Sequence, residues 1–336
     1  MNVLITGGTG YIGSHICSVL MDEFKNTTII DNLSNSKMKT IHNLKKISKN
    51  PINFIAGDVR DTNLVYKTIK ENKINHVIHL AGLKSVSNST EFPIEYYDNN
   101  VSGTISLLQA MNLANVKSLV FSSSATVYGA PQYLPLDEAH PTAAINPYGR
   151  SKLHIEEILR DTAHSNPDWR IACLRYFNPV GSHESGIIGD EPNGTPQNLM
   201  PYLAQVAAGM RPELNIYGND YNTTDGTGVR DYIHIMDLAE GHIAALDFLA
   251  AQASFHTFNL GTGRGYSVLE LLNCFEIACG KTIPHRFLAR RPGDVAECYA
   301  ATEKAKTHLG WHPKRSLEEM CESSWNFQKM LENPRN

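Results

Sequence analysis

Thr6-Gly7-Gly8-Thr9-Gly10-Tyr11-Ile12-Gly13 stands between an apolar run at residues 3–6 and a helix-like stretch at residues 12–24. Its glycines fit two overlapping patterns, Gly-x-x-Gly-x-x-Gly from Gly7 and Gly-x-Gly-x-x-Gly from Gly8. A glycine turn between a strand and a helix lets backbone N–H groups approach a pyrophosphate, because a Cβ there would intrude. The segment predicts a dinucleotide site. A glycine-rich turn without a ligand is the alternative that the glycines alone leave open.

Short apolar runs alternate with helix-length stretches through the first half of the chain. We expect strands at residues 3–6, 27–31, 53–56, 76–81, 119–123 and 171–176, and helices at residues 12–24, 63–71, 101–113 and 148–164. This alternation is typical of a Rossmann-type, doubly wound parallel sheet of the α/β class. After Asn178 the chain becomes rich in Gly, Pro, Asn and Thr, with one helix expected at 199–208, and α/β texture returns at 237–250 and 257–260. We therefore predict two domains: residues 1–178 plus about 232–262, and a smaller mixed α/β domain over about 179–231 plus 263–336.

Composition excludes several classes of function. The 30 Lys and Arg against 34 Asp and Glu give a formal charge of −4, so no large positive field would attract nucleic acid or an anionic membrane. The Lys-rich stretch 37–49 is interpreted as the solvated face of a helix. No run of 18 apolar residues predicts a membrane span. The six cysteines are scattered without a Cys-x-x-Cys, and the first residues lack a basic leader, so we expect no metal site and a cytoplasmic protein.

Two acidic residues extend the dinucleotide prediction. Asp31 ends the second expected strand, eighteen residues after Gly13, where an acid would bind the adenosine ribose hydroxyls. A carboxylate at that position repels a 2′-phosphate, which favours NAD over NADP. Asp58 and Val59 end the next strand and would hold the edge of the adenine, although ordinary strand-end capping by Asp58 is an open alternative.

A second group of residues indicates proton transfer. Ser124 closes the strand-end run Ser122-Ser123-Ser124, and Tyr148 and Lys152 stand four residues apart on an expected helix, hence on one face. An ammonium beside a phenol favours the phenolate, and bringing a tyrosine pKa from about 10 towards neutrality takes roughly 3 units. We expect Tyr148 to act as a general base for a substrate hydroxyl, with Ser124 relaying or orienting the proton. A surface helical pair is the alternative.

The residues around these motifs extend the match over nearly the whole chain. The chain resembles the extended short-chain dehydrogenases/reductases, and among them the UDP-glucose 4-epimerases. The segments that carry the resemblance are 6–15, 31–33, 80–84, 96–100, 122–129, 146–152, 174–181, 198–201, 228–234 and 290–294.

The resemblance implies a cofactor, a substrate and a reaction. Tyr148 would take the 4′-hydroxyl proton while hydride leaves C4′ for tightly bound NAD, and the 4-keto sugar would turn over and accept the hydride on its other face. Lys152 would depress the phenol pKa and Ser124 would assist. The NAD-binding residues would be Gly7, Gly10, Tyr11, Ile12, Gly13, Asp31, Asn32, Leu33, Asn35, Ser36, Asp58, Val59, Leu80, Ala81, Gly82, Lys84, Asn99, Ser124, Tyr148, Lys152 and Phe177. The UDP-sugar would contact Ser124, Tyr148, Asn178, Asn198, Leu199, Asn215, Ile216, Tyr217, Arg230, Arg291, Asp294 and Cys298. The first predicted domain would then bind NAD and the second the UDP-sugar.

Two finer expectations also come from the resemblance. Several family members carry tyrosine at the position of Cys298, so the smaller cysteine predicts room for an N-acetyl group and activity on UDP-GlcNAc and UDP-GalNAc. A homodimer through helices 101–113 and 152–160 is expected.

Four other functions stay open. A 4,6-dehydratase needs an adjacent Asp-Glu after the active-site residue, whereas Ala125 and Thr126 follow Ser124. A uronate epimerase or UDP-glucuronate decarboxylase fits the substrate-side segments less well. A non-catalytic NAD-sensing protein has little need of Tyr148, Lys152 and two arginines together.

Overall fold

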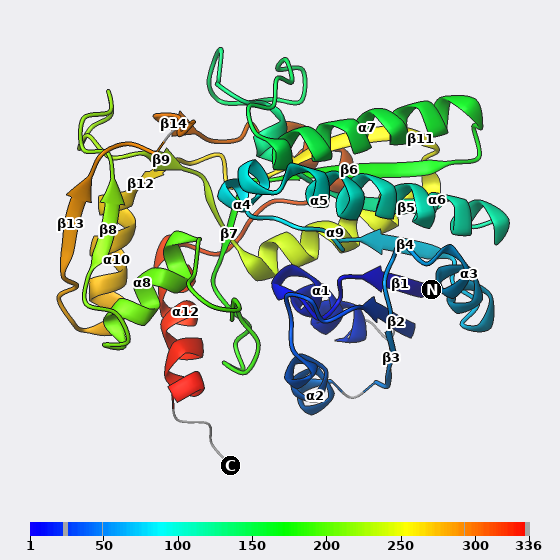
Figure 1. The fold of residues 1–336 in the computed structure, drawn as a ribbon, viewed down its shortest axis with the longest axis horizontal. Coiled ribbons are helices and arrows are strands. Elements are labelled where there is room, and N and C mark those ends of the chain that lie inside the picture. Colours follow the sequence, from blue (N-terminus) through cyan, green and yellow to red (C-terminus); the bar gives the residue numbers. More distant parts are fainter. Residues whose placement is uncertain (23–25, 49, 292, 333–336) are drawn as a thin grey trace.

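A parallel sheet forms the centre of the larger part of the molecule (Figure 1). The computed structural model describes residues 1–22, 26–48, 50–291 and 293–332. Within these ranges the sheet has seven strands in the order β11-β6-β5-β4-β1-β2-β3, all parallel. The order reverses at β1 and β4, the switch point where doubly wound folds bind ligands. The strands are β1 (Asn2–Thr6), β2 (Asn26–Asp31), β3 (Ile52–Ala56), β4 (His76–His79), β5 (Ser118–Ser124), β6 (Arg170–Tyr176) and β11 (Ser254–Leu260).

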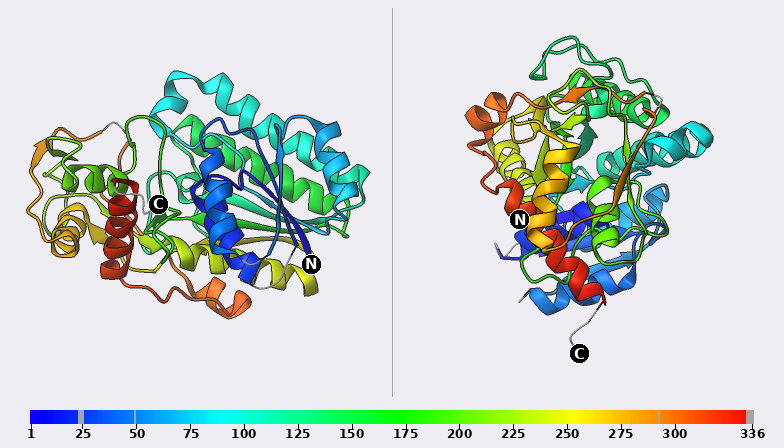
Figure 2. Two further views of the ribbon diagram at one scale, coloured as in Figure 1. Left: turned by 90° about the horizontal axis from the view of Figure 1, so that it is seen from below. Right: turned by 90° about the vertical axis from the view of Figure 1, so that its left-hand side faces the viewer.

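Helices cover both faces of this sheet (Figure 2). Alternate residues of β1 enter different cores: Val3 and Ile5 pack with α1, α2 and α9, whereas Leu4 packs with α3, α6 and α7. This alternation explains why the strands are apolar throughout, since each is buried on two faces. The helical segments of this part are α1 (Tyr11–Asp22), α2 (Met38–Ile47), α3 (Thr62–Glu71), α4 (Val86–Glu91), α5 (Pro93–Tyr96), the π-helix η1 (Tyr97–Ser102), α6 (Gly103–Leu113), the 3-10 turn η2 (Ala125–Val127), α7 (Pro147–Ser165), α9 (Ile235–Ala251) and α11 (Glu303–Leu309).

The remaining elements build a smaller part with short strands, on the left in Figure 1. Three small sheets pair β10 with β7, β9 with β12 and β14, and β13 with β8. Three helices pack over a separate apolar cluster that includes Leu203, Phe275 and Trp325. The elements are β7 (Asn178–Val180), α8 (Leu199–Ala207), β8 (Leu214–Tyr217), β9 (Val229–Arg230), β10 (Tyr232–His234), β12 (Tyr266–Ser267), α10 (Val268–Cys279), β13 (His285–Leu288), β14 (Glu297–Cys298) and α12 (Leu317–Glu332).

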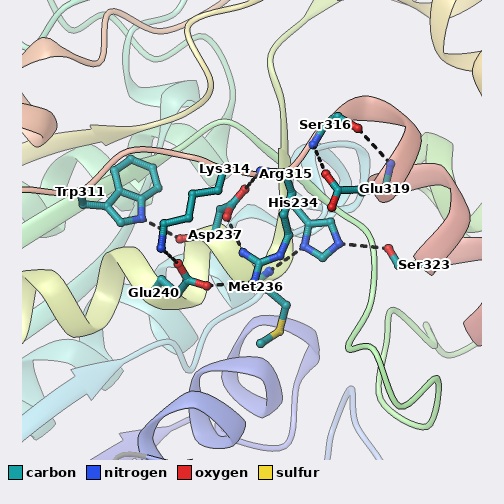
Figure 3. A network of polar contacts seen from close by, with 10 residues as sticks. All are labelled: His234, Met236, Asp237, Glu240, Trp311, Lys314, Arg315, Ser316, Glu319 and Ser323. Atoms are coloured by element: carbon teal, nitrogen blue, oxygen red, sulfur yellow. Dashed lines mark hydrogen bonds and ion pairs between the residues drawn. The ribbon is translucent and has the colours of Figure 1, made fainter.

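A polar network joins the segment before α12 to α9 (Figure 3). The Asp237 carboxylate, fully buried, accepts from the Arg315 backbone N–H at 3.0 Å and pairs with its guanidinium at 2.5 Å. The guanidinium also reaches Glu240 at 3.0 Å, and the Trp311 indole donates to the Asp237 carbonyl at 3.0 Å. His234 contacts Ser323 of α12 at 3.1 Å through its Nε2. These contacts fix the smaller part's last helix against the large sheet's layer of helices.

The structure corrects two expected boundaries. The strand expected at 76–81 ends at His79, because residues 80–84 leave the sheet to form a loop. The helix expected at 101–113 begins at Gly103, since the two residues before it belong to η1. The helix expected at 12–24 is described from Tyr11 to Asp22, and residues 23 and 24, on which its expected end falls, lie outside the described residues. No helix in the described ranges is long and apolar enough to cross a membrane.

Candidate functional site

The glycine turn lies at the switch point between β1 and β4. Gly7 has a φ of +73°, and a Cβ on it would lie 2.7 Å from the backbone nitrogen of Ala81. A Cβ on Gly13 would lie 2.4 Å from the Gly7 carbonyl oxygen. Both positions therefore exclude a side chain, and the turn presents bare backbone to the pocket in front of α1. The first N–H groups of a helix have no partner within the helix, so this turn can bind an anion.

A single elongated pocket collects most of the residues that the sequence assigns to the cofactor. Its lining includes Gly7, Gly10, Tyr11, Ile12, Gly13, Asp31, Asn32, Asn35, Ser36, Asp58, Val59, Leu80, Ala81, Gly82, Lys84, Asn99, Tyr148 and Lys152. Three others do not line it: Leu33, Ser124 and Phe177. Asn99 belongs to the π-helix η1, a type of segment that is frequent at functional sites.

Asp31 is held at the pocket edge by the chain itself. Its Oδ2 accepts from the Thr9 N–H at 3.1 Å, and its Oδ1 accepts from the Leu33 N–H at 2.8 Å and the Ser36 hydroxyl at 3.2 Å. Leu33 takes a left-handed φ of 58° to make this contact. These three contacts orient the carboxylate, and a carboxylate has about four acceptor positions, which leaves capacity for a ligand hydroxyl.

Asp58 has partners of its own at the neighbouring strand end. The Arg60 guanidinium donates to both carboxylate oxygens, at 3.0 and 2.9 Å, and the Asn32 amide donates to one at 3.0 Å. These donors lower the pKa of Asp58 to about 2. Asp58 therefore remains a carboxylate at physiological pH, and it orders the turn at Asn32 as well as lining the pocket.

Tyr148, Lys152 and Ser124 meet at the inner end of the pocket, where α7 packs on the carboxyl end of β5. Asn146 caps α7 by accepting from the Gly149 N–H at 2.8 Å. The Lys152 Nζ is buried, donates to the Ser122 carbonyl at 2.7 Å and lies 6.0 Å from the centre of the Tyr148 ring. Although Ser124 is absent from the pocket lining, its hydroxyl lies near the Tyr148 phenol and favours the phenolate form. The same hydroxyl accepts from the Thr126 N–H at 3.2 Å.

The Tyr148 pKa was expected to fall beside two cations, Lys152 and a bound nicotinamide. In the chain alone, burial raises the pKa of Tyr148 to about 12, and the nearby Ser124 hydroxyl partly opposes this shift. Burial also lowers the pKa of Lys152 to about 8. Sequence spacing gives the ammonium but not the depth of burial, and burial disfavours the charged form of both groups. The expectation that Tyr148 acts as a base near neutrality therefore depends on the second cation.

The residues assigned to the sugar diphosphate surround the small sheet β12-β9-β14. Arg230 of β9 pairs in register with Cys298 of β14, and its guanidinium lies 3.8 Å from Asp294. Cys298 also packs against the apolar cluster that contains Phe177. Burial raises the pKa of the Cys298 thiol to about 11, so it is a neutral small side chain.

A second group of assigned residues gathers along the sheet of β8 and β13. The Arg291 guanidinium lies 3.9 Å from the centre of the Tyr217 ring, a cation–π stack. Asn215 accepts from the Arg286 side chain at 2.8 Å. Ile216 is buried, so only its backbone can contact a ligand. The stack leaves the outer face of Tyr217 or Arg291 as a platform for a flat ring.

Asn178 connects the two halves of the candidate site. It begins β7, two residues after the pocket residue Tyr176, and its N–H donates to the Asp231 carbonyl at 2.9 Å, next to Arg230. Asn198 stands at the N-cap of α8 without a side-chain capping bond, and Leu199 is the first helical residue. The structure thus places Asn178 close to the cofactor pocket and to Arg230, whereas Asn198 and Leu199 belong to a separate helix, α8.

The pocket also has lining residues that the sequence did not predict. From the Lys-rich stretch, whose helix is α2, Lys37, Lys39, Thr40 and Asn43 line it, so that face is not simply solvated; Lys49 lies outside the described residues. Residues 187–192 also line it, tied to α2 by the Asn43 amide, which donates to the Ile187 carbonyl at 2.7 Å. The residues from the Lys-rich stretch could have been predicted, because they follow soon after Asp31, which the sequence already assigns to the pocket.

Comparisons with known proteins agree with this geometry. The chain matches a protein-family model described as GDP-mannose 4,6-dehydratase over residues 4–324. It is 52% identical over 328 residues to the UDP-glucose 4-epimerase of Bacillus subtilis (strain 168), which covers 98% of this chain and 97% of that one. The structure is similar, with a TM-score of 0.98 and 47% identity over 100% of both chains, to the UDP-glucose 4-epimerase of Stenotrophomonas maltophila crystallised with NAD and formylated UDP-arabinopyranose. The Bifidobacterium longum enzyme, solved with NAD+ and UDP, gives a TM-score of 0.95 at 48% identity over 99% of each chain.

Proposed function

The chain belongs to the UDP-glucose 4-epimerase family, and from that premise we propose that it interconverts UDP-glucose and UDP-galactose by inverting C4 of the sugar. The observation that supports this most strongly is the convergence of Tyr148, Lys152 and Ser124 at the inner end of a dinucleotide-shaped pocket. The enzyme is an isomerase on a dehydrogenase scaffold, since the net redox change is zero.

Its cofactor is NAD, and the pocket fits that group. A Cβ on Gly7 or Gly13 would collide with the chain's own backbone, so only glycine permits the tight turn that the diphosphate of a dinucleotide requires. Asp31 would bind the adenosine ribose and Asp58 the adenine end, while Lys152, Asn99 and the loop residue Lys84 would hold the nicotinamide half. When bound, NAD supplies the nicotinamide ring that accepts and returns the hydride and carries a positive charge that favours the phenolate.

The chain's own residues move one proton. Tyr148 takes the proton of the C4 hydroxyl when hydride leaves that carbon, and it returns the proton when the C4 oxygen is reduced again. Ser124, whose hydroxyl lies near the phenol, orients it. Lys152, held by the Ser122 carbonyl, supplies a fixed cation beside the phenol. Proton transfer of this type contributes about 10²–10⁴-fold to the rate.

The substrate half of the site suits a nucleoside diphosphate. Arg230 and Arg291 would bind the diphosphate, a role for which a planar, permanently charged guanidinium is well suited. Tyr217, with Asn215 and the Ile216 backbone, would hold the uracil. Asn178, Asn198, Leu199, Asp294 and Cys298 would complete the sugar and diphosphate contacts. In this arrangement residues 1–178 with about 232–262 bind NAD, and about 179–231 with 263–336 bind the UDP-sugar.

The dehydratase description of the matching family model does not transfer to this site. A 4,6-dehydratase needs an acid and a base beside the active-site residue to remove water across C5 and C6. Here Ala125 and Thr126 follow Ser124, and the Thr126 hydroxyl donates to the Ser124 oxygen at 3.0 Å. This position holds no carboxylate, so elimination lacks its proton carriers.

The assembly and the compartment complete the proposal. The enzyme works as a homodimer through α6 and α7, because the helical face beside them presents Ile105 and a stacked pair of rings, Tyr97 and His154, at 5.8 Å. It works in the cytoplasm, because all six cysteines are free thiols, as expected in a reducing compartment.

Product analysis tests the reaction directly. The purified, NAD-loaded protein is incubated in parallel with UDP-galactose, UDP-GalNAc and UDP-glucuronate, and the nucleotide sugars are separated by chromatography. UDP-glucose should form from UDP-galactose without net reduction of NAD. A 4-keto-6-deoxy product would indicate a dehydratase, and an unchanged nucleotide sugar in all three incubations would indicate a binding protein without catalysis.

A further inference from the structure

One stripe of α7 carries the two residues of the proposed catalytic pair and a third, unassigned residue. Tyr148, Lys152 and Glu156 follow one another at intervals of four, so they lie on the same side of the helix. Glu156 is fully buried, four residues beyond Lys152. A buried carboxylate in this position needs partners, and the neighbouring strands provide them.

Three consecutive residues of β5 hold this stripe. The Ser124 hydroxyl lies near the Tyr148 phenol and favours its phenolate form, and the Ser122 carbonyl accepts from Lys152 at 2.7 Å. The residue between them, Ser123, donates its hydroxyl to Glu156 Oε1 at 2.5 Å. Ser123 is buried and does not line the cofactor pocket. The end of one strand therefore contacts three successive turns of the helix.

Arg175 of β6 holds the other side of Glu156. Its Nε and its terminal nitrogen donate to the two carboxylate oxygens at 3.0 and 2.7 Å, a bidentate pair. The side chains are 3% and 0% exposed, and the guanidinium lies 4.8 Å from the centre of the Tyr128 ring. A buried ion pair is weak evidence for a contribution to stability, because desolvation offsets most of the attraction. Its geometry, in contrast, restricts the position of α7 on two strands at once.

We propose that Ser123 and Glu156, held by Arg175, are positioning residues that fix the rotation and register of α7 on β5 and thereby the places of Tyr148 and Lys152. The assignment rests on the proposed function, which makes those two residues the catalytic pair. None of the three positioning residues touches the cofactor pocket. They act through the helix that carries the reacting groups.

The charges around Tyr148 and Lys152 also support a positioning role for Glu156. Burial lowers the pKa of Lys152, and the negative Glu156 one turn away opposes that shift. The titratable groups that face Tyr148 are Lys152 on its own helix, Tyr96 from α5 and Tyr176 from β6. Both tyrosines are neutral near pH 7, so the ammonium is the cation whose placement matters for Tyr148.

The test is Ser123→Ala in the NAD-loaded protein, with Ser18→Ala as the matched control. Ser18 is a buried serine of α1 whose hydroxyl donates to the His15 carbonyl at 2.7 Å, so the control loses one comparable hydrogen bond away from α7. Two quantities are measured: steady-state kinetics with UDP-galactose, and the pH titration of Tyr148 by ultraviolet absorbance. Subtracting the titration of the matching Tyr148→Phe protein isolates that phenol.

We expect Ser123→Ala to lower kcat by about tenfold while KM changes less than about twofold, because small misplacements of reacting groups slow chemistry. The Tyr148 titration should move upward by about half a pH unit, since the cation is held less closely. Glu156→Gln should lower kcat further, because it breaks the ion pair with Arg175 that holds α7. Ser18→Ala should leave both quantities as in the wild type. If Glu156→Gln does not fold, the kinetics and the Tyr148 titration of Ser123→Ala alone test the positioning role.

Two results would overturn the positioning role. The first is a Ser123→Ala protein with the wild-type kcat and the wild-type Tyr148 titration. The second is a loss of activity with an unshifted titration, matched by an equal loss of bound NAD, which is what general structural damage produces. The titration needs no turnover. If the wild type does not epimerise, the proposed function fails, while the titration still reports whether Ser123 positions the pair.

Discussion

At the scale of single residues, Tyr148 is the most exacting position. Tyr148→Phe keeps the ring and removes only the hydroxyl, so the fold and the bound NAD should remain. Turnover should fall by about 10²–10⁴-fold, because the proton of the C4 hydroxyl loses its acceptor. The epimerisation rate and the extracted nucleotide are measured on the same preparation. A variant with wild-type turnover would remove Tyr148 from the mechanism.

Arg230 tests the substrate half of the site separately. Arg230→Ala should weaken binding of UDP by about 1.5–3 kcal/mol, the net value of a charge-assisted hydrogen bond, and leave NAD occupancy unchanged. Calorimetric titration with UDP gives the first quantity and nucleotide extraction the second. Arg170→Ala is the control, because that guanidinium donates to the Ala250 carbonyl at 2.7 Å and carries no assigned substrate role. Equal UDP affinity in wild type and Arg230→Ala would make Arg230 merely structural.

Cys298 tests which sugars fit. Its side chain, in register with Arg230, is much smaller than a tyrosine, so we expect room for an N-acetyl group and interconversion of UDP-GlcNAc and UDP-GalNAc as well. Cys298→Tyr should keep the glucose/galactose reaction and lose the N-acetyl one through overpacking. Both substrate pairs are assayed on both proteins. The idea fails if the wild type ignores UDP-GalNAc or if the variant converts it equally well.

The residues show where sequence reasoning succeeds and where it stops. Gly7 and Gly13 were predictable because their role depends on local backbone. The upward shift of the Tyr148 pKa was not predictable, because the burial of the phenol is a property of the folded molecule. The bond between Glu156 and Arg175 was also out of reach, since it exists only because β6 lies beside β5. Local spacing predicts that Tyr148 and Lys152 share one face of a helix, but it does not predict which residues of other elements pack against that face.

At the scale of elements, the same distinction separates the central sheet from the small sheet of β12, β9 and β14. The central strands are short apolar runs that repeat with intervening helices, and the sequence predicted them. Strands β9, β12 and β14 have two residues each, too few to show any alternation, and they form only through pairing with one another. The helices α10 and α12 were not predicted, and their apolar residues face a cluster built from distant segments.

The joint between α9 and the segment before α12 carries a stability prediction. Arg315→Met leaves the buried Asp237 carboxylate without its guanidinium, so the free energy of unfolding should fall by about 3 kcal/mol. Urea unfolding followed by tryptophan fluorescence measures it, with Trp311 at the joint as a local probe. Lys306→Met, which removes an exposed pair with Glu303, should change the value by less than about 0.5 kcal/mol. Equal losses of the free energy of unfolding in both variants would show that the contacts of Arg315 stabilise the protein no more than an exposed ion pair does.

At the scale of the whole molecule, the exposed apolar side chains of α5 and α6 are where we expect the second subunit of the proposed homodimer to bind. Ile105 on α6 is 40% exposed and Ile94 on α5 is 82% exposed, beside the stacked Tyr97 and His154 rings. Large apolar side chains gathered on one helical face mark a contact surface more often than scattered ones do. A two-fold homodimer would bury the same face on both subunits, since such an interface is self-complementary.

Sedimentation distinguishes this surface from other exposed apolar positions. The wild type should sediment with twice the mass of one chain, and Ile105→Glu should shift it towards a single chain, because an unpaired carboxylate is costly to bury. Ile277→Glu is the control, since Ile277 is 83% exposed on α10, in the smaller part of the molecule. A wild type that sediments as one chain at micromolar concentration contradicts the homodimer. A dimer that only Ile277→Glu dissociates would move the interface from α6 and α7 to α10.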